Sequence, residues 1–198
     1  AIFNYFDHDE QSALRISSDE VKTLRYGENP HQKGLFYGNL DECFEQLHGK
    51  EISYNNLLDI DAAVSLIADF NETALAILKH NNACGMACRP TVKAAWEAAL
   101  AADSVSAFGG IVATNQTVDK EAATAISEIF FEVLIAPDYT PEALEVLFQK
   151  KNRIILKQKS TKQTTNQLQI RSLLNGFLAQ DKDNSIQNRE DLKVVTHI

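Results

Sequence analysis

Ala74-Leu75-Ala76-Ile77-Leu78 is the stretch of sequence that decides the fold. This apolar run is short, and the polar, glycine-containing residues 79–85 follow it. A short apolar run with such a boundary is typical of a buried β-strand. Lys79 and His80 come directly after the run. Because ligands of open α/β sheets bind beyond the carboxyl ends of strands, the pattern predicts a cation and an imidazole at a ligand-binding edge.

Around this run, predicted strands alternate with predicted helices. Ile60, Ala63, Val64 and Ile67 recur at helical spacing, and Asp59 before them is a candidate N-cap. Further strands are predicted at 110–114, 131–136 and 153–156, and helices at 91–102, after Asp119 and after Thr140-Pro141. Such alternation predicts an α/β fold with a largely parallel sheet and right-handed crossovers.

The two ends of the chain are less regular. The additional elements that we predict are a short helix from residues 17–20, a strand at 35–37, a helix over 40–50, a surface loop at 158–167, and short strands at 168–170 and 176–180. These boundaries divide the chain into a first segment 1–58, an α/β core 59–157, and a final segment 158–198 that ends in a severed element. The chain begins with Ala1 instead of Met, which is typical of a fragment or a processed protein.

The composition is that of a globular protein, with 198 residues of which 44% are hydrophobic and 23% charged. No apolar run is long enough to cross a bilayer, and no secretory signal is visible, so we expect a cytoplasmic protein without a membrane partner. The net charge of −8 argues against nucleic acid as a partner but allows a local basic pocket. The odd number of cysteines, Cys43, Cys84 and Cys88, favours reduced thiols over a disulfide framework.

Four segments are candidates for loops at one edge of the sheet, namely 25–32, 53–56, 79–85 and 103–110. Gly109-Gly110 permits close approach of the backbone to a ligand, although a glycine pair before a strand is more often only a turn. Arg25 and Tyr26 offer a guanidinium fork and a hydroxyl group to a phosphate or carboxylate, although an Arg in a polar loop is most often solvated.

For the other polar residues, explanations without a functional role stay open. Lys79 and His80 can be a strand end whose side chains simply meet water, and His31 is more often a loop residue than a ligand. Glu132 interrupts an otherwise apolar predicted strand. A carboxylate there needs a partner or a wet cavity, unless the strand lies at the edge of the sheet.

Several motifs are absent from the sequence. The spacing of Cys84 and Cys88 is wrong for a zinc pair, which argues against a zinc site. Neither a Gly-x-Gly-x-x-Gly nor a Walker-type phosphate loop occurs, which argues against dinucleotide and P-loop nucleotide sites.

Three long motifs occur together and in order: Leu24-Arg25-Tyr26-Gly27-Glu28-Asn29-Pro30-His31-Gln32, Lys79-His80-Asn81-Asn82-Ala83-Cys84-Gly85 and Asp103-Ser104-Val105-Ser106-Ala107-Phe108-Gly109-Gly110. With Val133-Leu134-Ile135-Ala136-Pro137, they make the chain similar to the bifunctional family of phosphoribosylaminoimidazolecarboxamide (AICAR) formyltransferase/IMP cyclohydrolase. The resemblance implies the first half of the transformylase domain, with a three-layer α/β/α, cytidine-deaminase-like fold that has lost the zinc.

The resemblance also implies a reaction, in which the formyl group of 10-formyltetrahydrofolate passes to the 5-amino group of AICAR ribotide. Within it, His80 is the base and Lys79 stabilises the developing charge. The residues that match substrate contacts are Arg25, Tyr26, Asn55, Gly109 and Glu132. Ala83 replaces a common Pro, which predicts a slightly looser loop without lost chemistry.

The same resemblance sets the expected partners. They are the ribotide and the folate co-substrate, with no metal in this segment and a homodimer in the parent protein. Because much of the folate pocket belongs to the second half of the domain, we expect the isolated chain to be inactive. The alternative is a non-catalytic fragment that only folds, dimerises or binds the ribotide.

Overall fold

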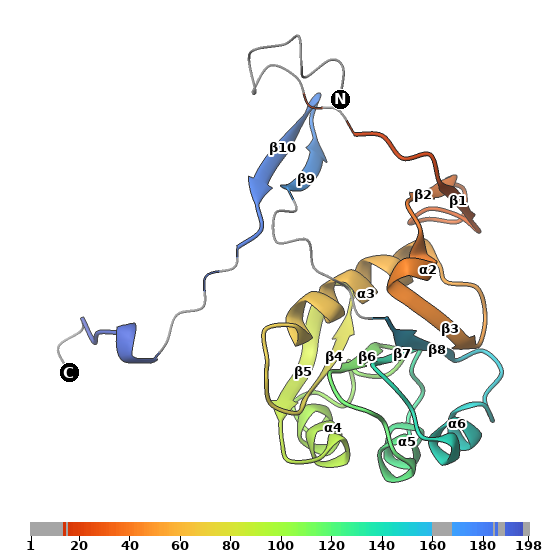
Figure 1. Ribbon diagram of the computed structural model, residues 1–198, viewed down its shortest axis with the longest axis vertical. Coiled ribbons are helices and arrows are strands. Elements are labelled where there is room, and N and C mark those ends of the chain that lie inside the picture. The colour runs from red at the N-terminus through yellow and green to blue at the C-terminus, as the bar shows by residue number, and fades with distance from the viewer. Residues whose placement is uncertain (1–13, 15, 160–167, 184, 186–188, 196–198) are drawn as a thin grey trace. The chain divides into compact units, whose positions relative to one another are not determined.

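The computed structural model describes residues 14, 16–159, 168–183, 185 and 189–195, and the chain divides into two compact units, Ala1–Ser160 and Thr161–Ile198. The elements of the first unit are β1 (Val21–Leu24), β2 (Gly34–Tyr37), α2 (Leu40–Cys43), β3 (Phe44–His48), α3 (Tyr54–Ile67), β4 (Ala74–Lys79), β5 (Asn82–Cys88), α4 (Val92–Leu100), β6 (Ile111–Thr114), α5 (Lys120–Ile126), β7 (Val133–Ala136), α6 (Pro141–Leu147) and β8 (Ile154–Gln158) (Figure 1). Those of the second are β9 (Leu168–Leu173), β10 (Gly176–Asp181) and a 3-10 helix (Arg189–Asp191). The division of the chain at residues 58 and 157 stays a prediction.

A six-stranded sheet in the order β3-β8-β7-β6-β4-β5 forms the centre of the first unit. Strands β6, β7 and β8 are mutually parallel, whereas β4 is antiparallel to both of its neighbours and β3 is antiparallel to β8. Strand β5 therefore runs with β6, β7 and β8, and β3 and β4 run the other way. The α/β class is confirmed, but the sheet is mixed, and β4 is one of the two reversed strands.

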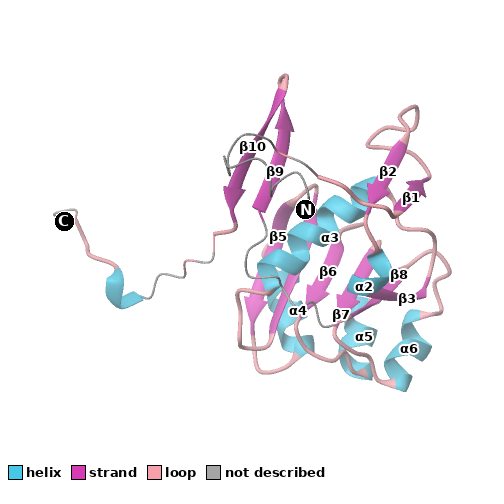
Figure 2. Ribbon diagram, turned by 45° about the horizontal axis from the view of Figure 1, so that its top comes forward, coloured by secondary structure: helices cyan, strands magenta, loops and turns pink. Residues whose placement is uncertain are grey.

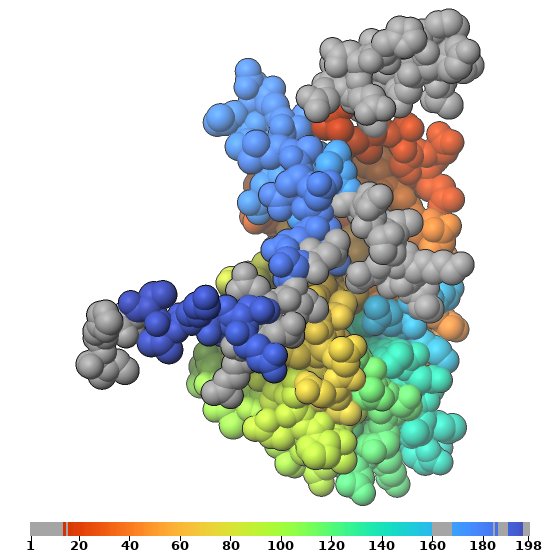
Figure 3. Space-filling model, turned by 60° about the vertical axis from the view of Figure 1, so that its left-hand side comes forward, coloured from red at the N-terminus to blue at the C-terminus, as the bar shows by residue number. Residues whose placement is uncertain are grey.

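Burial along the strands alternates between the two faces of the sheet. Leu75 and Ile77 belong to the hydrophobic core on one face, and Ala76 and Leu78 belong to the core on the other. Helices α4, α5 and α6 cover the first face and α3 crosses the second (Figures 1 and 2). In the space-filling view, residues coloured yellow, green and cyan lie directly against one another (Figure 3). The predicted three layers, α/β/α, are confirmed.

Helix α3 begins earlier than predicted, because Ser53 and not Asp59 is its N-cap. The Ser53 hydroxyl accepts the Asn56 N–H at 3.1 Å, and the Asn56 side chain accepts the Ser53 N–H at 3.2 Å. This capping box satisfies two of the donors that every helix start leaves unpaired. Asp59 therefore lies in the second turn of the helix, with its side chain available for another contact.

Other predictions for the ends of the first unit were wrong. The segment 17–20 is not helical, and the predicted helix over 40–50 is the single turn α2 followed by strand β3. Antiparallel pairing with β8 overrides the local helical spacing in β3. Most of the predicted loop 158–167, and the last residues 196–198, lie outside the described residues.

In the second unit, the predicted short strands are confirmed. They are β9 and β10, which pair antiparallel from Leu173 and Gly176 outward.

The direction of β4 decides which segments meet at each end of the sheet. Because β4 runs against β6, its carboxyl end lies beside the amino ends of β6 and β7. We call this end, with Lys79, Gly110 and Glu132, the Lys79 edge. The opposite end, where β6 and β7 stop at Thr114 and Ala136, is the Tyr139 edge.

Candidate functional site

A two-residue turn presents His80 at the Lys79 edge. Lys79 pairs with Asn82 across the β4–β5 hairpin, so His80 and Asn81 alone form the connection. Both have left-handed backbone conformations, with φ of 53° for His80 and 60° for Asn81. These are the conformations of a type I′ turn, whose twist matches that of paired strands. The prediction of a loop over 79–85 was wrong, because β5 begins at Asn82.

Lys79 and His80 lie at the same edge but in different surroundings. The Lys79 side chain is half-buried, and its Nζ donates to the carbonyl oxygen of Phe108 at 2.9 Å. His80 is exposed. The contact with Phe108 joins the end of β4 to the segment 103–110, which enters β6. The two predicted loop segments thus meet because β4 and β6 are antiparallel.

The chain's own packing accounts for Gly109-Gly110. Gly109 has a φ of 76°, a conformation that favours glycine, and its N–H donates to the Phe130 carbonyl at 2.8 Å. A Cβ atom on Gly110 would lie 2.8 Å from the Leu78 carbonyl oxygen, so a side chain there would displace the backbone. The pair therefore lets the entry to β6 pack against the end of β4.

Glu132 has hydrogen-bond partners, but it does not lie at an edge strand of the sheet. It directly precedes β7, which lies between β8 and β6, so the alternative of an edge strand is wrong. Its Oε2 accepts from Lys50 Nζ at 3.1 Å and from Asn56 Nδ2 at 3.1 Å. The carboxylate is about one-third exposed, with a side-chain accessibility of 31%, so it stays open to a ligand.

The segment with Arg25 and Tyr26 connects β1 to β2 and is braced internally. The Gln32 side chain accepts from both the backbone and the side chain of Asn29, at 2.8 and 3.1 Å. The Arg25 guanidinium lies 5.6 Å from the centroid of the Tyr26 ring and is exposed. Asn55 Nδ2 donates to the Glu28 carbonyl at 3.2 Å, which attaches this segment to the start of α3.

Three further residues organise this edge, namely Lys50 and Asn56, which the sequence did not point to, and Asp59, which it indicated only as an N-cap. Asn56 pairs with Glu132, and Asp59 binds the backbone of the His80 turn. A helix start at Ser53 would have revealed both, because Asn56 and Asp59 are three residues apart and so share a helix face. For Lys50 the sequence carries no such signal.

The three cysteines are free thiols. Burial, and then the negative charge of Asp103, raises the pKa of Cys84, which disfavours the nucleophilic thiolate form. Cys84 and Cys88 are four residues apart on one strand, about 13 Å, which is too far for a disulfide. Within the described part of the chain, no three His, Cys, Asp or Glu side chains are grouped to hold a metal ion.

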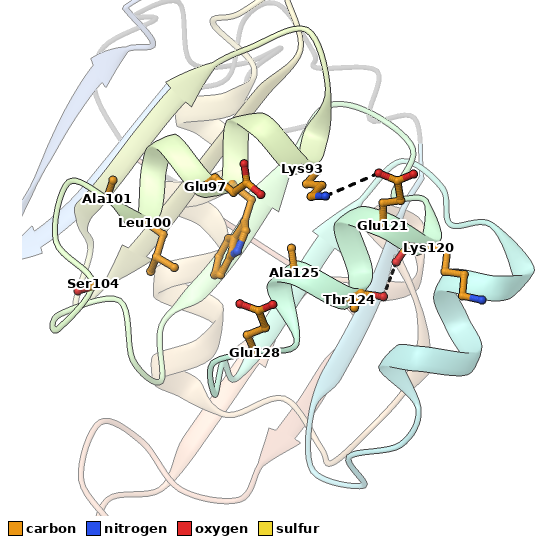
Figure 4. A pocket seen from close by; sticks show the side chains of 11 residues that line it. Lys93, Glu97, Leu100, Ala101, Ser104, Lys120, Glu121, Thr124, Ala125 and Glu128 are labelled. Carbon is orange, nitrogen blue, oxygen red and sulfur yellow. Dashed lines mark hydrogen bonds and ion pairs between the residues drawn. The ribbon is translucent and has the colours of Figure 1, made fainter.

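A groove of about 710 Å³ lies away from the candidate residues, between α4 and α5 (Figure 4). Its lining mixes charges of both signs, and Lys93 and Glu121 face each other across it at 3.8 Å. None of the predicted site residues lines it. We regard this groove as the seam between two surface helices, because Lys93 of α4 and Glu121 of α5 already pair with each other across it.

Among the residues that the structure describes, no helix is both long and apolar enough to span a membrane. The fold and the gathered side chains define the class of protein: an α/β domain with a cation, an imidazole and a carboxylate at one edge of a mixed sheet. Comparison with known proteins makes this more specific. The family model of the AICARFT/IMPCHase bienzyme matches residues 1–198, and the chain belongs to this family.

The relatives carry one common description, "Bifunctional purine biosynthesis protein PurH". The protein from Bacteroides thetaiotaomicron is 63% identical over 196 residues, covering 99% of this chain and 38% of the relative. The Chloroflexus aurantiacus protein is 48% identical, covering 92% and 36%, and the Rhodospirillum rubrum protein is 49% identical, covering 88% and 34%. The chain thus spans little more than a third of the length of these relatives.

Proposed function

We propose that this chain carries the catalytic Lys-His pair of an AICAR formyltransferase that acts in purine (IMP) biosynthesis. The family match and the description of the relatives support the pathway and the reaction. One observation carries the proposal: Lys79 and His80 lie at the same sheet edge as Gly109 and Glu132, with Lys79 hydrogen-bonded to the segment that contains Gly109. The chain supplies acid-base and electrostatic groups there, and the rest of the domain completes the site.

In the proposed reaction, the 5-amino group of AICAR ribotide attacks the formyl carbon of 10-formyltetrahydrofolate. This amine is a weak nucleophile because its lone pair is delocalised into the imidazole carboxamide. His80 accepts the proton that the amine loses as the new C–N bond forms. The bond from the formyl carbon to N10 then breaks, and N10 takes up a proton as tetrahydrofolate leaves.

Lys79 acts on the charge that develops during this transfer. Its ammonium group stabilises the negative charge on the formyl oxygen in the tetrahedral intermediate. The hydrogen bond to the Phe108 carbonyl fixes the ammonium before the substrates arrive, while Nζ keeps two further protons for donation. Such a preorganised donor contributes about 10²–10³ in rate.

The ribotide is proposed to contact Arg25, Tyr26, Asn55, Gly109 and Glu132. Arg25 suits a phosphate because its guanidinium is exposed and carries a fork of donors. Glu132 suits a sugar hydroxyl, because a carboxylate oxygen accepts strong hydrogen bonds. Asn55 contributes by attaching the loop of Arg25 to α3 through Glu28.

The remaining parts of the proposal concern the parent protein. We place it in the cytoplasm as a homodimer without nucleic acid, membrane or metal as a partner of this segment, and we assign the fold to the cytidine-deaminase-like group. The folate contacts are assigned to the part of the domain outside this chain. The isolated chain is therefore expected to show little or no formyl transfer.

The test uses a chimera in which this chain replaces the matching segment of the Bacteroides thetaiotaomicron relative. The chimera should release tetrahydrofolate in the presence of AICAR ribotide and 10-formyltetrahydrofolate. The variant His80→Ala should lower kcat by at least about 10²-fold. As a matched control, His48→Ala removes another imidazole, which stacks on Phe148 at 4.6 Å, and should change kcat less than about threefold.

The outcome that contradicts the proposal is near-normal turnover in His80→Ala. The second candidate function, a non-catalytic fragment, is favoured by the small share of the relatives that the chain covers. It predicts that the chimera binds AICAR ribotide in calorimetry but transfers no formyl group.

A further inference from the structure

Asp59 of helix α3 holds the backbone of the turn that carries His80. Its Oδ1 accepts the N–H of Asn81 at 2.6 Å, and its Oδ2 lies 3.3 Å from the N–H of His80. Both carboxylate oxygens therefore face the two central residues of one turn. Hydrogen bonds from N–H groups to an ionised carboxylate are stronger than those between neutral groups.

The turn requires support of this kind because both of its central residues have positive φ. L-residues other than glycine pay a conformational penalty there, and type I′ turns accordingly prefer Asn-Gly. Here the two positions hold His80 and Asn81, whose φ values are 53° and 60°. Residues in such conformations persist only when the surrounding structure fixes them, and they cluster at functional sites.

Side chains around the turn complete the support. With its amide nitrogen facing α3, Asn81 donates to the Leu58 carbonyl at 3.1 Å and to Asp59 Oδ1 at 3.0 Å. Asn82 Nδ2 donates to the His80 carbonyl at 2.8 Å. The turn is thus attached to α3 through Asp59 and Leu58, and its carbonyl group is held from the first residue of β5.

Asp59 is itself fixed in place. The capping box at Ser53 defines where α3 begins, and Asn56 attaches the same face of the helix to Glu132. The next residue, Ile60, is 2% exposed and lies in the core between α3 and the sheet. A carboxylate on a helix held in this way can impose one conformation on the turn.

We infer that Asp59 is a positioning residue, which fixes the His80-Asn81 turn so that the His80 imidazole is held at the same edge of the sheet as the Lys79 ammonium. The inference rests on the proposed function for its effect on rate, while the clamp on the turn stands on the contacts alone. Asp59 does not exchange protons with the substrate in this account. It lowers the number of conformations in which His80 is misplaced.

The kinetic test compares variants of the chimera by kcat and by KM for AICAR ribotide. Asp59→Ala should lower kcat at least tenfold while changing KM less than threefold, because His80 is present but misplaced. Asp59→Asn keeps one acceptor for the Asn81 N–H and should lose less. Asp61→Ala is the matched control, because Asp61 is exposed on the same helix, and it should behave as the unmodified chimera.

Rescue by glycine separates positioning from a general structural role. Asn81→Gly removes the penalty of positive φ at one of the two central positions, so the turn depends less on the clamp. In the Asp59→Ala background it should restore kcat at least threefold. Asp59→Ala with normal kcat, or a loss that neither Asn81→Gly nor Asp59→Asn diminishes, overturns the inference.

A second readout keeps this inference distinct from the proposed function. In the 198-residue chain, NMR-detected hydrogen exchange of the Asn81 amide should accelerate at least tenfold in Asp59→Ala and stay within threefold in Asp61→Ala. Faster exchange together with normal turnover in His80→Ala would overturn the proposed function and leave the clamp intact. Unchanged exchange in Asp59→Ala would overturn the clamp itself.

Discussion

The two edges of the central sheet differ in how their polar groups are used. At the Lys79 edge, the carboxyl end of β4 carries an exposed imidazole on a turn with two positive φ values, and Glu132 nearby is partly exposed. At the Tyr139 edge, the Thr114, Asn115 and Tyr139 side chains form hydrogen bonds with the protein's own backbone. The Lys79 edge thus includes residues in unfavourable backbone conformations, whereas the hydrogen bonds at the Tyr139 edge stabilise the fold.

Contacts within the chain close the Tyr139 edge. Thr114 Oγ1 donates to the Ala74 carbonyl at 2.8 Å, and Asn115 accepts the Ala74 N–H at 2.9 Å while donating to the carbonyls of Phe70 and Glu72. The Tyr139 hydroxyl lies 2.8 Å from the Leu156 carbonyl. The side-chain polar groups of Thr114, Asn115 and Tyr139 are thus bonded to the protein's own backbone.

The general rule about where ligands bind to α/β sheets therefore has to be applied strand by strand. Ligands of α/β sheets are expected beyond the carboxyl ends of the parallel strands, which is the Tyr139 edge here. The reversed strand β4 instead ends at the other edge, and it carries Lys79 there. Lys79 lies at the carboxyl end of a strand as predicted, although it is the last residue of β4 and does not follow it, and the edge it marks is the amino end of β6 and β7.

The largest expected effect separates the two edges by charge. Lys79→Ala in the chimera should lower kcat by about 10²-fold, because it removes a preorganised cation. Lys157→Ala removes a lysine near the end of β8, at the Tyr139 edge, and should change kcat less than about twofold. Steady-state kinetics with both substrates measure this pair, and equal losses in the two variants contradict the division.

An intermediate effect is expected on stability at the Tyr139 edge. Tyr139 is 7% exposed, and burial raises the pKa of its hydroxyl well above the usual value, so it acts as a neutral donor. Tyr139→Phe should lower the free energy of unfolding by about 1–2 kcal/mol through the lost hydrogen bond. Urea denaturation of the chain measures this, with the exposed Tyr37→Phe as control. If Tyr139→Phe lowers kcat strongly but leaves the free energy of unfolding unchanged, the Tyr139 edge has a functional role, which contradicts the account.

The smallest effect concerns the exposed ion pair at the Tyr139 edge. Asp138 lies 2.8 Å from Lys157, whose hydrogen bond lowers the pKa of the carboxyl and in turn raises the pKa of the ammonium. Because its pKa is lowered, Asp138 contributes fully to folding stability at a pH above the pKa that it has in the unfolded chain. This contribution is lost as the pH falls through the lower pKa of the folded protein. Because its pKa is raised, Lys157 contributes fully to folding stability at a pH below the pKa that it has in the unfolded chain. This contribution is lost as the pH rises through the higher pKa of the folded protein.

Asp138→Asn should therefore lower Tm by about 1–2 °C near neutral pH, because the pair is exposed and screened by water. The difference from the unmodified chain should vanish in acid below the folded pKa of Asp138. Thermal unfolding followed by circular dichroism at pH 7 and in acid measures it. A difference that persists undiminished in acid means that Asp138 contributes by something other than its charge.

How much of this organisation the sequence predicts depends on whether local or distant contacts decide it. The apolar runs of β4 and β7, and the helices after Asp119 and Thr140, follow local burial and capping signals and were confirmed. The direction of β4 was not predictable from its own residues. It depends on the turn at His80-Asn81, whose positive φ values are stabilised by Asp59 from another element.

The candidate site shows the same division. Lys79, His80, Arg25, Tyr26, Asn55, Gly109 and Glu132 were all named from the sequence, and their roles remain predictions. The residues that hold them were missed, because Lys50 and Asn56 meet Glu132 across 82 and 76 residues of chain. Such contacts exist only once the sheet and α3 have packed together.

The most direct test of the account is a crystal structure of the chimera with AICAR ribotide bound. We expect the ribotide to lie at the Lys79 edge, with its 5-amino nitrogen about 3 Å from the His80 imidazole or joined to it by one water. A ribotide bound at the Tyr139 edge, or in the groove between α4 and α5, would contradict it.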